Sequence, residues 1–194
     1  MTDIKDIETH GREELFEGLR GVTVGQNKSA FIYENCRMSL RTLSPDDVVP
    51  AQRYLLSGRL EIIARVAERL RDFGADMFDL DGFVRMKISD APHEIDLLPP
   101  VAEVTADGIT LLNDGMHRFE TARRLGRTVR TVCIENVPKE YPYYAHPLPG
   151  GWSDVKIYDT LPEGERKKLY RRDFSELYRD FNSVFRNVGC PRER

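Results

Sequence analysis

The residues best suited to chemistry lie together in the stretch LLNDGMHRFETARRLG, residues 111–126. Gly115 lets the backbone turn sharply, and the free N–H groups of a helix that begins behind it form a natural phosphate site. His117 and Arg118 would lie in the first helical turn, where a cation opposes the helix dipole unless an anion binds there. The pattern therefore predicts an anion site. Its alternative is an ordinary turn followed by a solvated helix.

The helix expected over 116–125 separates an apolar stripe from a polar one. Helical spacing groups Met116, Phe119, Ala122 and Leu125 on the first stripe, and His117, Thr121 and Arg124 on the second. Gly126 would end the helix. The predicted phosphate contacts are Asp114, Gly115, Met116, His117, Arg118 and Thr121.

Two carboxylates are candidates for holding Mg²⁺. Asp114 would lie beside bound phosphates, and Mg²⁺ commonly takes only one or two carboxylates from the protein. Glu103, on the preceding strand, is the second candidate. Both have plainer alternatives, since Asn113 or Asp114 can cap the helix and Glu103 can lie on a polar strand face.

The elements that must position these residues follow from the periodicity of the rest of the chain. Apolar residues at steps of three and four predict a helix from Gly58 to Gly74, and Ser44-Pro45 suits a short helical start. The other expected elements are a strand near 36–43, a short hairpin or inserted strand pair within 76–88 turning at Asp81-Gly82, a connection over 89–100, a hairpin at Asp107-Gly108, and strands at 128–137 and 154–161. Strand, helix, strand order predicts an α/β fold with a mixed sheet.

The two ends of the chain differ from this middle part. We expect a polar leader over 1–28, helical or frayed to residue 20, then a core over 29–137 and an extension over 138–194 packed on it. Basic residues alternate with aromatic ones in the tail, which suits nucleic acid or an amphipathic helix docked on the core. Acidic residues interrupt the basic ones, so docking is favoured. The docking residues would be Leu169, Phe174, Leu177, Tyr178 and Phe181.

The overall composition narrows the class of protein. The chain has 194 residues, 40 % of them hydrophobic and 31 % charged, with a net charge of −3. These values are typical of a globular protein and give no global sign of nucleic-acid binding. The apolar runs are too short for a membrane span, and the polar start is unlike a signal peptide, so we expect a cytoplasmic protein without a membrane partner. Cys36, Cys133 and Cys190 are too widely spaced for a disulfide framework or a zinc site.

The stretch from 111 to 137 resembles the core of the ParB/sulfiredoxin-like superfamily, in which a strand, a DGxHR turn, a helix ending in LG and a return strand follow one another. The matching residues are Asp114, Gly115, His117, Arg118, Ala122, Leu125, Gly126 and the strand 129–134. The earlier segment 36–74 resembles the family's leading strand, proline-containing loop and helix. The resemblance implies that nucleotide phosphates lie against the helix that begins after Gly115.

Departures from the pattern distinguish among the family's activities. Sulfiredoxins carry a catalytic cysteine where this chain has Met116, which has no thiolate to attack a phosphoryl group. The arginine-rich box and helix-turn-helix of chromosome-partitioning ParB proteins are not evident. The chain is more similar to ParB-like kinases that phosphorylate free serine with ADP or ATP. Those kinases use a glutamate in the proline-containing loop as general base. Here the alternatives are Asp47, which can take a proton, and Gln52, which cannot.

The aromatic stretch YPYYAHPLPGGW loosely resembles the region that follows the return strand in these kinases. It suggests a substrate pocket, or alternatively a packed aromatic loop. The pocket residues would be Gln52, Tyr143, Tyr144, His146 and Trp152.

Together these observations lead to one functional hypothesis and one alternative. The first is a phosphotransferase that uses ATP or ADP with Mg²⁺ on a small serine-like substrate, with Asp47, His117 and Arg118 as catalytic residues. The alternative is a non-catalytic or DNA-associated regulator in which nucleotide acts as a switch. The acceptor, the nucleotide base and the oligomeric state are left open by the sequence.

Overall fold

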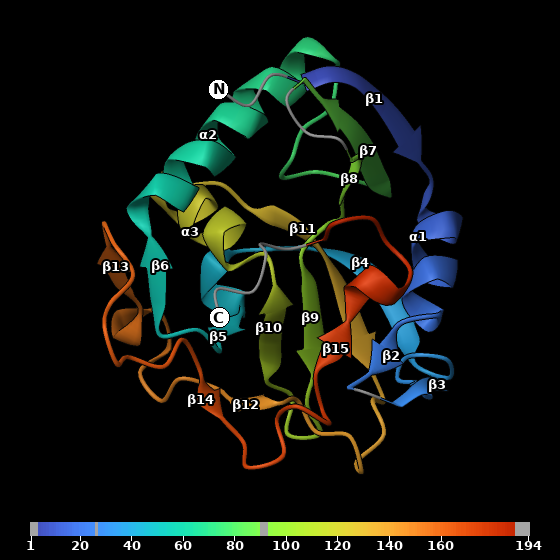
Figure 1. Ribbon diagram of the computed structural model, residues 1–194, viewed down its shortest axis with the longest axis vertical. Coiled ribbons are helices and arrows are strands. Elements are labelled where there is room, and N and C mark those ends of the chain that lie inside the picture. The colour runs from blue at the N-terminus through green and yellow to red at the C-terminus, as the bar shows by residue number, and fades with distance from the viewer. Residues whose placement is uncertain (1–3, 26, 90–92, 189–194) are drawn as a thin grey trace.

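The central layer of the protein is a five-stranded mixed sheet in the order β4-β11-β9-β10-β5 (Figure 1). The structure is a computed structural model that describes residues 4–25, 27–89 and 93–188, so Cys190 lies outside it. β11 runs antiparallel to β4 and parallel to β9, whereas β10 runs antiparallel to β9 and parallel to β5. The five strands are β4 (Arg37–Leu43), β11 (Val129–Glu135), β9 (Val101–Val104), β10 (Thr110–Asp114) and β5 (Val49–Pro50). This is the predicted mixed α/β fold, including the hairpin at Asp107-Gly108.

A second, antiparallel sheet consists of β1 (Ile4–His10), β7 (Phe83–Ile88) and β8 (Ile95–Leu97). It corrects three expectations: the leader contains a strand, 76–88 is not a hairpin, and the expected connection contains β8. The Asp81-Gly82 pair precedes β7 and joins no strand pair, because the partners of β7 are β1 and β8. These pairings are set by distant residues, which local turn signals do not report.

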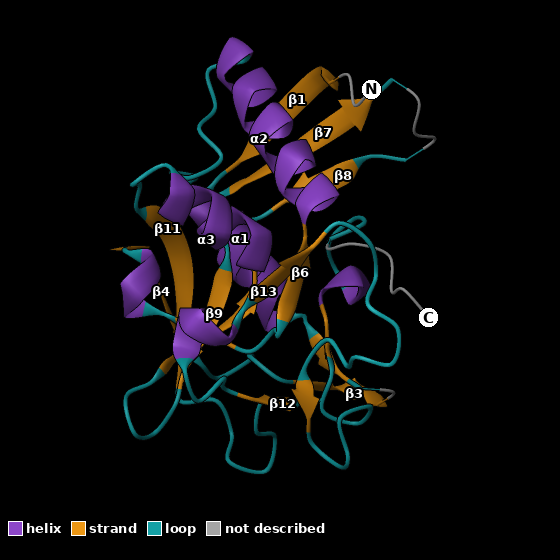
Figure 2. Cartoon of the chain, turned by 90° about the vertical axis from the view of Figure 1, so that its left-hand side faces the viewer, coloured by secondary structure: helices purple, strands orange, loops and turns teal. Residues whose placement is uncertain are grey.

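In the described part of the chain, three α-helices cover the sheets. Figure 2 shows α2 (Ser57–Asp72) lying across the β1-β7-β8 sheet, where Leu60 and Leu70 share a core with Val84. α3 (Met116–Arg124) packs beside α2 and adds Phe119 to the same core. α1 (Arg12–Arg20) belongs to a second core with the central strands β9 and β11. The predicted helices at 58–74 and 116–125 are therefore confirmed.

The remaining elements are short, and several of them pair segments near the chain ends with other parts of the chain. Three turns of 3-10 helix are η1 (Pro45–Asp47), η2 (Gly151–Asp154) and η3 (Phe181–Ser183). Three small pairings join segments far apart in the sequence: β15 (Arg179–Asp180) with β2 (Thr23–Val24), β13 (Lys156–Tyr158) with β6 (Tyr54–Leu56), and β12 (Ala145–His146) with β14 (Leu169–Tyr170). In addition, β2 pairs with the strand that follows it, β3 (Asn27–Phe31).

The prediction of an amphipathic tail helix is wrong. Over 169–181 the chain forms β14, turns and β15 rather than a helix. Leu177 is buried, whereas Leu169 and Phe174 are substantially exposed, so the apolar residues do not form one docked stripe. The tail nevertheless contacts distant parts of the chain, because β15 pairs with β2 and Leu177 shares a hydrophobic cluster with Leu111 of β10. Among the described residues, no helix has the length and apolar character needed to cross a membrane.

Candidate functional site

The candidate site is built around the junction of β10 and α3. Gly115 begins the helix with a φ of 94°, and a Cβ at this position would lie 2.6 Å from Pro100 Cβ. Only glycine tolerates both this left-handed conformation and the close approach. Among the residues that the structure describes, no side chain caps the start of this helix, which corrects the expected capping by Asn113 or Asp114. The N–H groups of the first turn are therefore left without a side-chain acceptor.

Arg118 does not point outward from the helix. Its side chain is buried, and its guanidinium donates hydrogen bonds to the carbonyl oxygen of Leu98 and to Asp114 Oδ2, the latter at 3.1 Å. Burial lowers the pKa of Arg118, and the charge of Asp114 opposes that shift. The arginine therefore fixes the direction of the Asp114 carboxylate, whose side chain remains 29 % exposed.

Glu103 belongs to a buried network rather than to an open site. Its two oxygens accept hydrogen bonds from Arg179, at 2.8 and 3.1 Å, and Oε1 also accepts from Tyr33 and Asn113. Arg179 further donates to the backbone oxygens of Tyr141, Pro142 and Leu177. Because both carboxylate oxygens are engaged, Glu103 has no oxygen left for Mg²⁺. Within the described ranges, no group of three or more His, Cys, Asp or Glu side chains is arranged to hold a metal ion.

His117 lies among positive charges at the start of α3. Burial, and after it the positive charges of Lys167 and Arg59, lower the pKa of His117 to about 4, while the charge of Asp114 opposes this shift. The ring is therefore neutral near pH 7. Its Nε2 is buried and has no hydrogen-bond partner among the described residues. Arg59, in the first turn of α2, and Lys167, just before β14, thus act electrostatically on the same place.

Lys168 extends this group from the C-terminal segment. Its backbone forms an isolated β-bridge with Gln52, and its Nζ donates to the hydroxyls of Tyr143 and Tyr144 at 2.7 and 2.5 Å. Tyr143 in turn donates to the carbonyl oxygen of Asn113, the residue before Asp114. Three of the predicted pocket residues, Gln52, Tyr143 and Tyr144, are therefore brought together beside the end of β10.

Other predicted site residues lie elsewhere. Asp47 is exposed in η1, where its Oδ2 accepts from the backbone N–H of Ser44 at 2.7 Å. Trp152 donates to the carbonyl oxygens of Pro45 and Val48, and its ring stacks on Phe119. The side chain of His146 is exposed on β12.

Two residues of the predicted α3 stripes also differ from expectation. Thr121 is buried and donates from its hydroxyl to the carbonyl oxygen of His117, so it does not face a ligand. Leu125 is 56 % exposed, because the helix ends at Arg124 before the apolar stripe returns to the core. Met116, by contrast, is buried in the core as the apolar stripe predicts, which leaves only its backbone for a phosphate.

The sequence did not single out Arg59, Lys167 or Lys168. Arg59 is one of several arginines on α2, and only the packing of α2 against α3 distinguishes it. The two lysines lie in the basic part of the tail that suggested phosphate binding, but nothing local shows that one of them is buried. The burial of Lys168 depends on its β-bridge to Gln52, which lies more than a hundred residues earlier in the chain.

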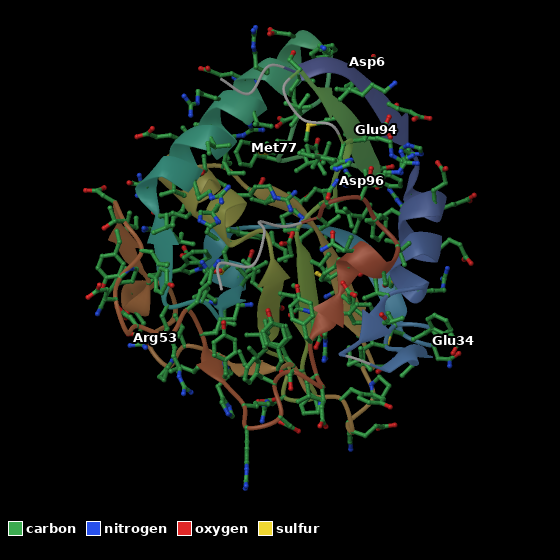
Figure 3. The ribbon with its side chains drawn as sticks, in the orientation of Figure 1. Asp6, Glu34, Arg53, Met77, Glu94 and Asp96 are labelled. Carbon is green, nitrogen blue, oxygen red and sulfur yellow. The ribbon has the colours of Figure 1, made fainter. Side chains whose placement is uncertain are left out.

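A cavity of about 950 Å³ lies away from these residues, between the β7–β8 end of the second sheet and the C-terminal segment. Lys87, Glu94 and Arg186 are among its lining residues, and Glu94 pairs with both cations. Figure 3 shows Glu94 and Asp96 close together at this sheet, and Arg53 far from them at the lower left. The backbone N–H of Arg53 donates to the carbonyl oxygen of Lys167 at 2.8 Å, which places the candidate site on the Arg53 side of the molecule.

Comparison with known proteins identifies a family. The family model described as the ParB CE domain matches residues 14–156, which include β10, α3 and the return strand β11. No curated protein and no solved structure matches the chain. The matched segment spans most of the chain, and the protein therefore belongs to the ParB CE domain family.

Proposed function

We propose that the protein binds the phosphates of ATP or ADP at the start of α3 and transfers a phosphoryl group to a small hydroxylated acceptor. One observation carries the proposal: the buried Nε2 of His117, which has no hydrogen-bond partner among the described residues, lies at the uncapped first turn of α3, where the positive charges of Arg59 and Lys167 also act. In the described part of the chain, neither cation forms an ion pair with an acidic side chain. Neighbouring positive charges repel one another, so an anion bound between them is favoured.

Each group at the site has a role in this proposal. The first-turn N–H groups and His117 donate hydrogen bonds to phosphate oxygens, while Arg59 and Lys167 balance their charge. Because its pKa is about 4, His117 acts as a neutral donor and not as the cation that its type first suggests. Arg118 acts through Asp114, whose carboxylate it orients. Phosphoryl transfer depends mainly on positioning and charge stabilisation, which such groups supply.

Asp114 is the residue that would hold Mg²⁺. Its Oδ2 accepts from Arg118, and no hydrogen bond to its Oδ1 occurs among the described residues. A single carboxylate together with substrate phosphates is a common protein site for Mg²⁺, so the donor set fits. The ion, when bound, would reduce the negative charge of the phosphates.

The binding half of the proposal is tested by calorimetric titration with ATP and ADP, each with and without Mg²⁺. Arg59→Gln and Lys167→Gln should each weaken ATP binding about 10-fold, since a charged contact is worth on the order of 1.4 kcal/mol. Arg65→Gln, an exposed arginine further along α2, is the matched control and should leave the affinity unchanged. Absence of nucleotide binding, or equal effects of all three substitutions, would contradict the proposed site.

The catalytic half is tested separately with ATP, Mg²⁺ and L-serine, following the phosphorylated product by ³¹P NMR. Product formation supports a phosphotransferase. Nucleotide binding without transfer would instead favour a regulator in which nucleotide acts as a switch. Salt-sensitive binding of duplex DNA would support the DNA-associated form of that alternative.

A further inference from the structure

Asp47 is not placed to act as the general base of the proposed transfer. Its carboxylate accepts a hydrogen bond from the backbone N–H of Ser44 within the turn of η1. Its neighbour Asp46 acts on Arg123, in the last turn of α3, where the charge of Asp46 adds to the larger effect of Glu120 in raising the pKa of the Arg123 guanidinium. The phosphate site lies at the first turn of the same helix. A group at the first-turn end is therefore needed to accept the proton of the acceptor hydroxyl.

Lys168 is the buried titratable group at that end. The residue is 8 % exposed, and it forms no ion pair within the described residues. Two tyrosine hydroxyls are its hydrogen-bond partners, and its Nζ lies 5.2 and 4.5 Å from the centres of the Tyr143 and Tyr144 rings. An ammonium group buried with neutral partners alone is unfavourable, whereas a neutral amine is well accommodated.

The hydrogen bonds around Lys168 leave one position on the amine open. A neutral amine has two N–H donors and one lone pair. The hydroxyls of Tyr143 and Tyr144 accept from both donors, and the Tyr143 hydroxyl directs its own proton to the carbonyl oxygen of Asn113. With the hydrogen bonds in these directions, the lone pair of Nζ accepts no hydrogen bond from its described neighbours.

The surrounding charges keep the amine close to its neutral form. Burial lowers the pKa of Lys168 to about 7, and the charge of Asp114, on β10, opposes this shift. The other groups facing it are Tyr143 and Tyr144, with Arg179 of β15 beyond the Tyr143 ring at 5.7 Å. No hydrogen bond or ion pair joins Lys168 to Asp114 within the described residues.

We propose that Lys168 is the general base of the phosphotransferase, held by Tyr143 and Tyr144. This inference rests on the proposed function. The acceptor hydroxyl gives its proton to the lone pair of Nζ, and its oxygen forms the new bond to the terminal phosphorus of ATP. The bond between that phosphorus and the bridging oxygen breaks, ADP leaves, and the resulting ammonium later returns its proton to water.

The kinetic test uses the full chain with ATP, Mg²⁺ and L-serine. Lys168→Met and Lys168→Arg should each lower kcat about 100-fold or more, because loss of a general base typically has this effect. The Kd of ATP should change less than about threefold, which shows that each variant is folded. Lys139→Met, at an exposed lysine, is the control and should match the wild type. Retention of kcat by both Lys168 variants would overturn the proposal.

The pH dependence separates a base from a merely structural lysine. Wild-type kcat should rise with pH through a midpoint near 7 and then stay level. Tyr144→Phe removes an acceptor that favours the charged amine, so its midpoint should move to lower pH. An unchanged midpoint in Tyr144→Phe would contradict the role of the tyrosine pair.

An NMR titration of ¹³C-labelled lysine gives a readout that does not depend on turnover. The Lys168 Cε resonance, assigned by its loss in Lys168→Arg, should titrate near pH 7. A resonance that stays in the charged form through pH 9 would overturn the base assignment even if phosphate is transferred. Failure of the wild type to transfer phosphate would instead overturn the proposed function, and the base assignment with it.

Discussion

Arg118 Nη2 lies 3.1 Å from Asp114 Oδ2, one helical turn away across the Gly115 junction. The arginine that the sequence suggests as a phosphate ligand is thus buried, and it orients a carboxylate that is only partly exposed. Arg118 also donates a hydrogen bond to the carbonyl oxygen of Leu98, which holds its guanidinium against the segment before β9. The orientation of Asp114 therefore depends on a contact that the DGxHR pattern does not reveal.

Substitution of Asp114 should destabilise the protein more than substitution of Arg118. Asp114→Asn leaves the guanidinium of Arg118 buried without a counter-charge, a situation that typically costs about 3–5 kcal/mol. Arg118→Gln leaves a carboxylate that water can reach, so its cost should be smaller. Urea unfolding of both variants measures the difference. Equal losses of unfolding free energy, or a larger loss for Arg118→Gln, would contradict the view that Asp114 supplies the counter-charge of a buried arginine.

A second prediction concerns the buried pair of Glu103 and Arg179, whose side chains are 6 % and 0 % exposed. Glu103→Gln should reduce the free energy of unfolding by about 3–5 kcal/mol, because the Arg179 guanidinium would remain buried without its carboxylate. The double variant Glu103→Leu/Arg179→Met should lose less than the sum of its single changes, since no charge is then left unpaired. Additive losses in urea unfolding would show that the two residues act independently.

Much of the fold could be predicted because its signals are local. The β9–β10 hairpin, the turn at Gly115, α3 and the return strand β11 follow one another, and each carries its own turn residue or periodicity. β1 and the short strands of the tail could not be found in this way. Their partners lie far away in the sequence, and pairing with β7 or β2 decides their conformation.

The site was predictable to a similar degree. The positions of Gly115 and His117 at the start of α3 follow from local rules, whereas their binding of phosphate stays a prediction. The sequence places Arg118 in the first turn of α3 but not the direction of its side chain, because its acceptor, the carbonyl oxygen of Leu98, lies twenty residues earlier. Lys168 could not be assigned, since a basic run gives no sign that one lysine will be buried between two tyrosines.

The Gly115 junction provides a third prediction, for which the chain offers a matched control. Gly115→Ala combines a positive φ with a Cβ placed 2.6 Å from Pro100, whereas Gly126→Ala has a φ of 63° and nothing within 4 Å. Gly126→Ala should therefore cost about 1 kcal/mol, for the backbone conformation alone. Gly115→Ala should cost more, because the clash adds to that strain. Equal losses in urea unfolding would show that the approach of Pro100 is not tight.

The last prediction follows from His117. Its pKa is about 4 in the folded protein against 6.5 ordinarily, and burial is the main cause. Between these values the unfolded chain binds a proton that the folded protein does not, so the free energy of unfolding should fall as pH falls from about 6.5 to 4. The full effect is on the order of 3 kcal/mol, from about 1.4 kcal/mol for each pH unit of the shift.

The measurement is urea unfolding of the wild type, His117→Gln and His146→Gln between pH 4.5 and 7. The window stops at 4.5 because carboxylates with lowered pKa values, such as Asp76 and Glu120, lose their stabilising charge at lower pH. His117→Gln should flatten the slope, whereas His146→Gln, at an exposed side chain, should retain it. Saturating ATP should also flatten the wild-type slope, because an anion beside the ring would favour its charged form in the folded protein. A slope that His117→Gln leaves unchanged would mean that the ring is not buried as neutral imidazole.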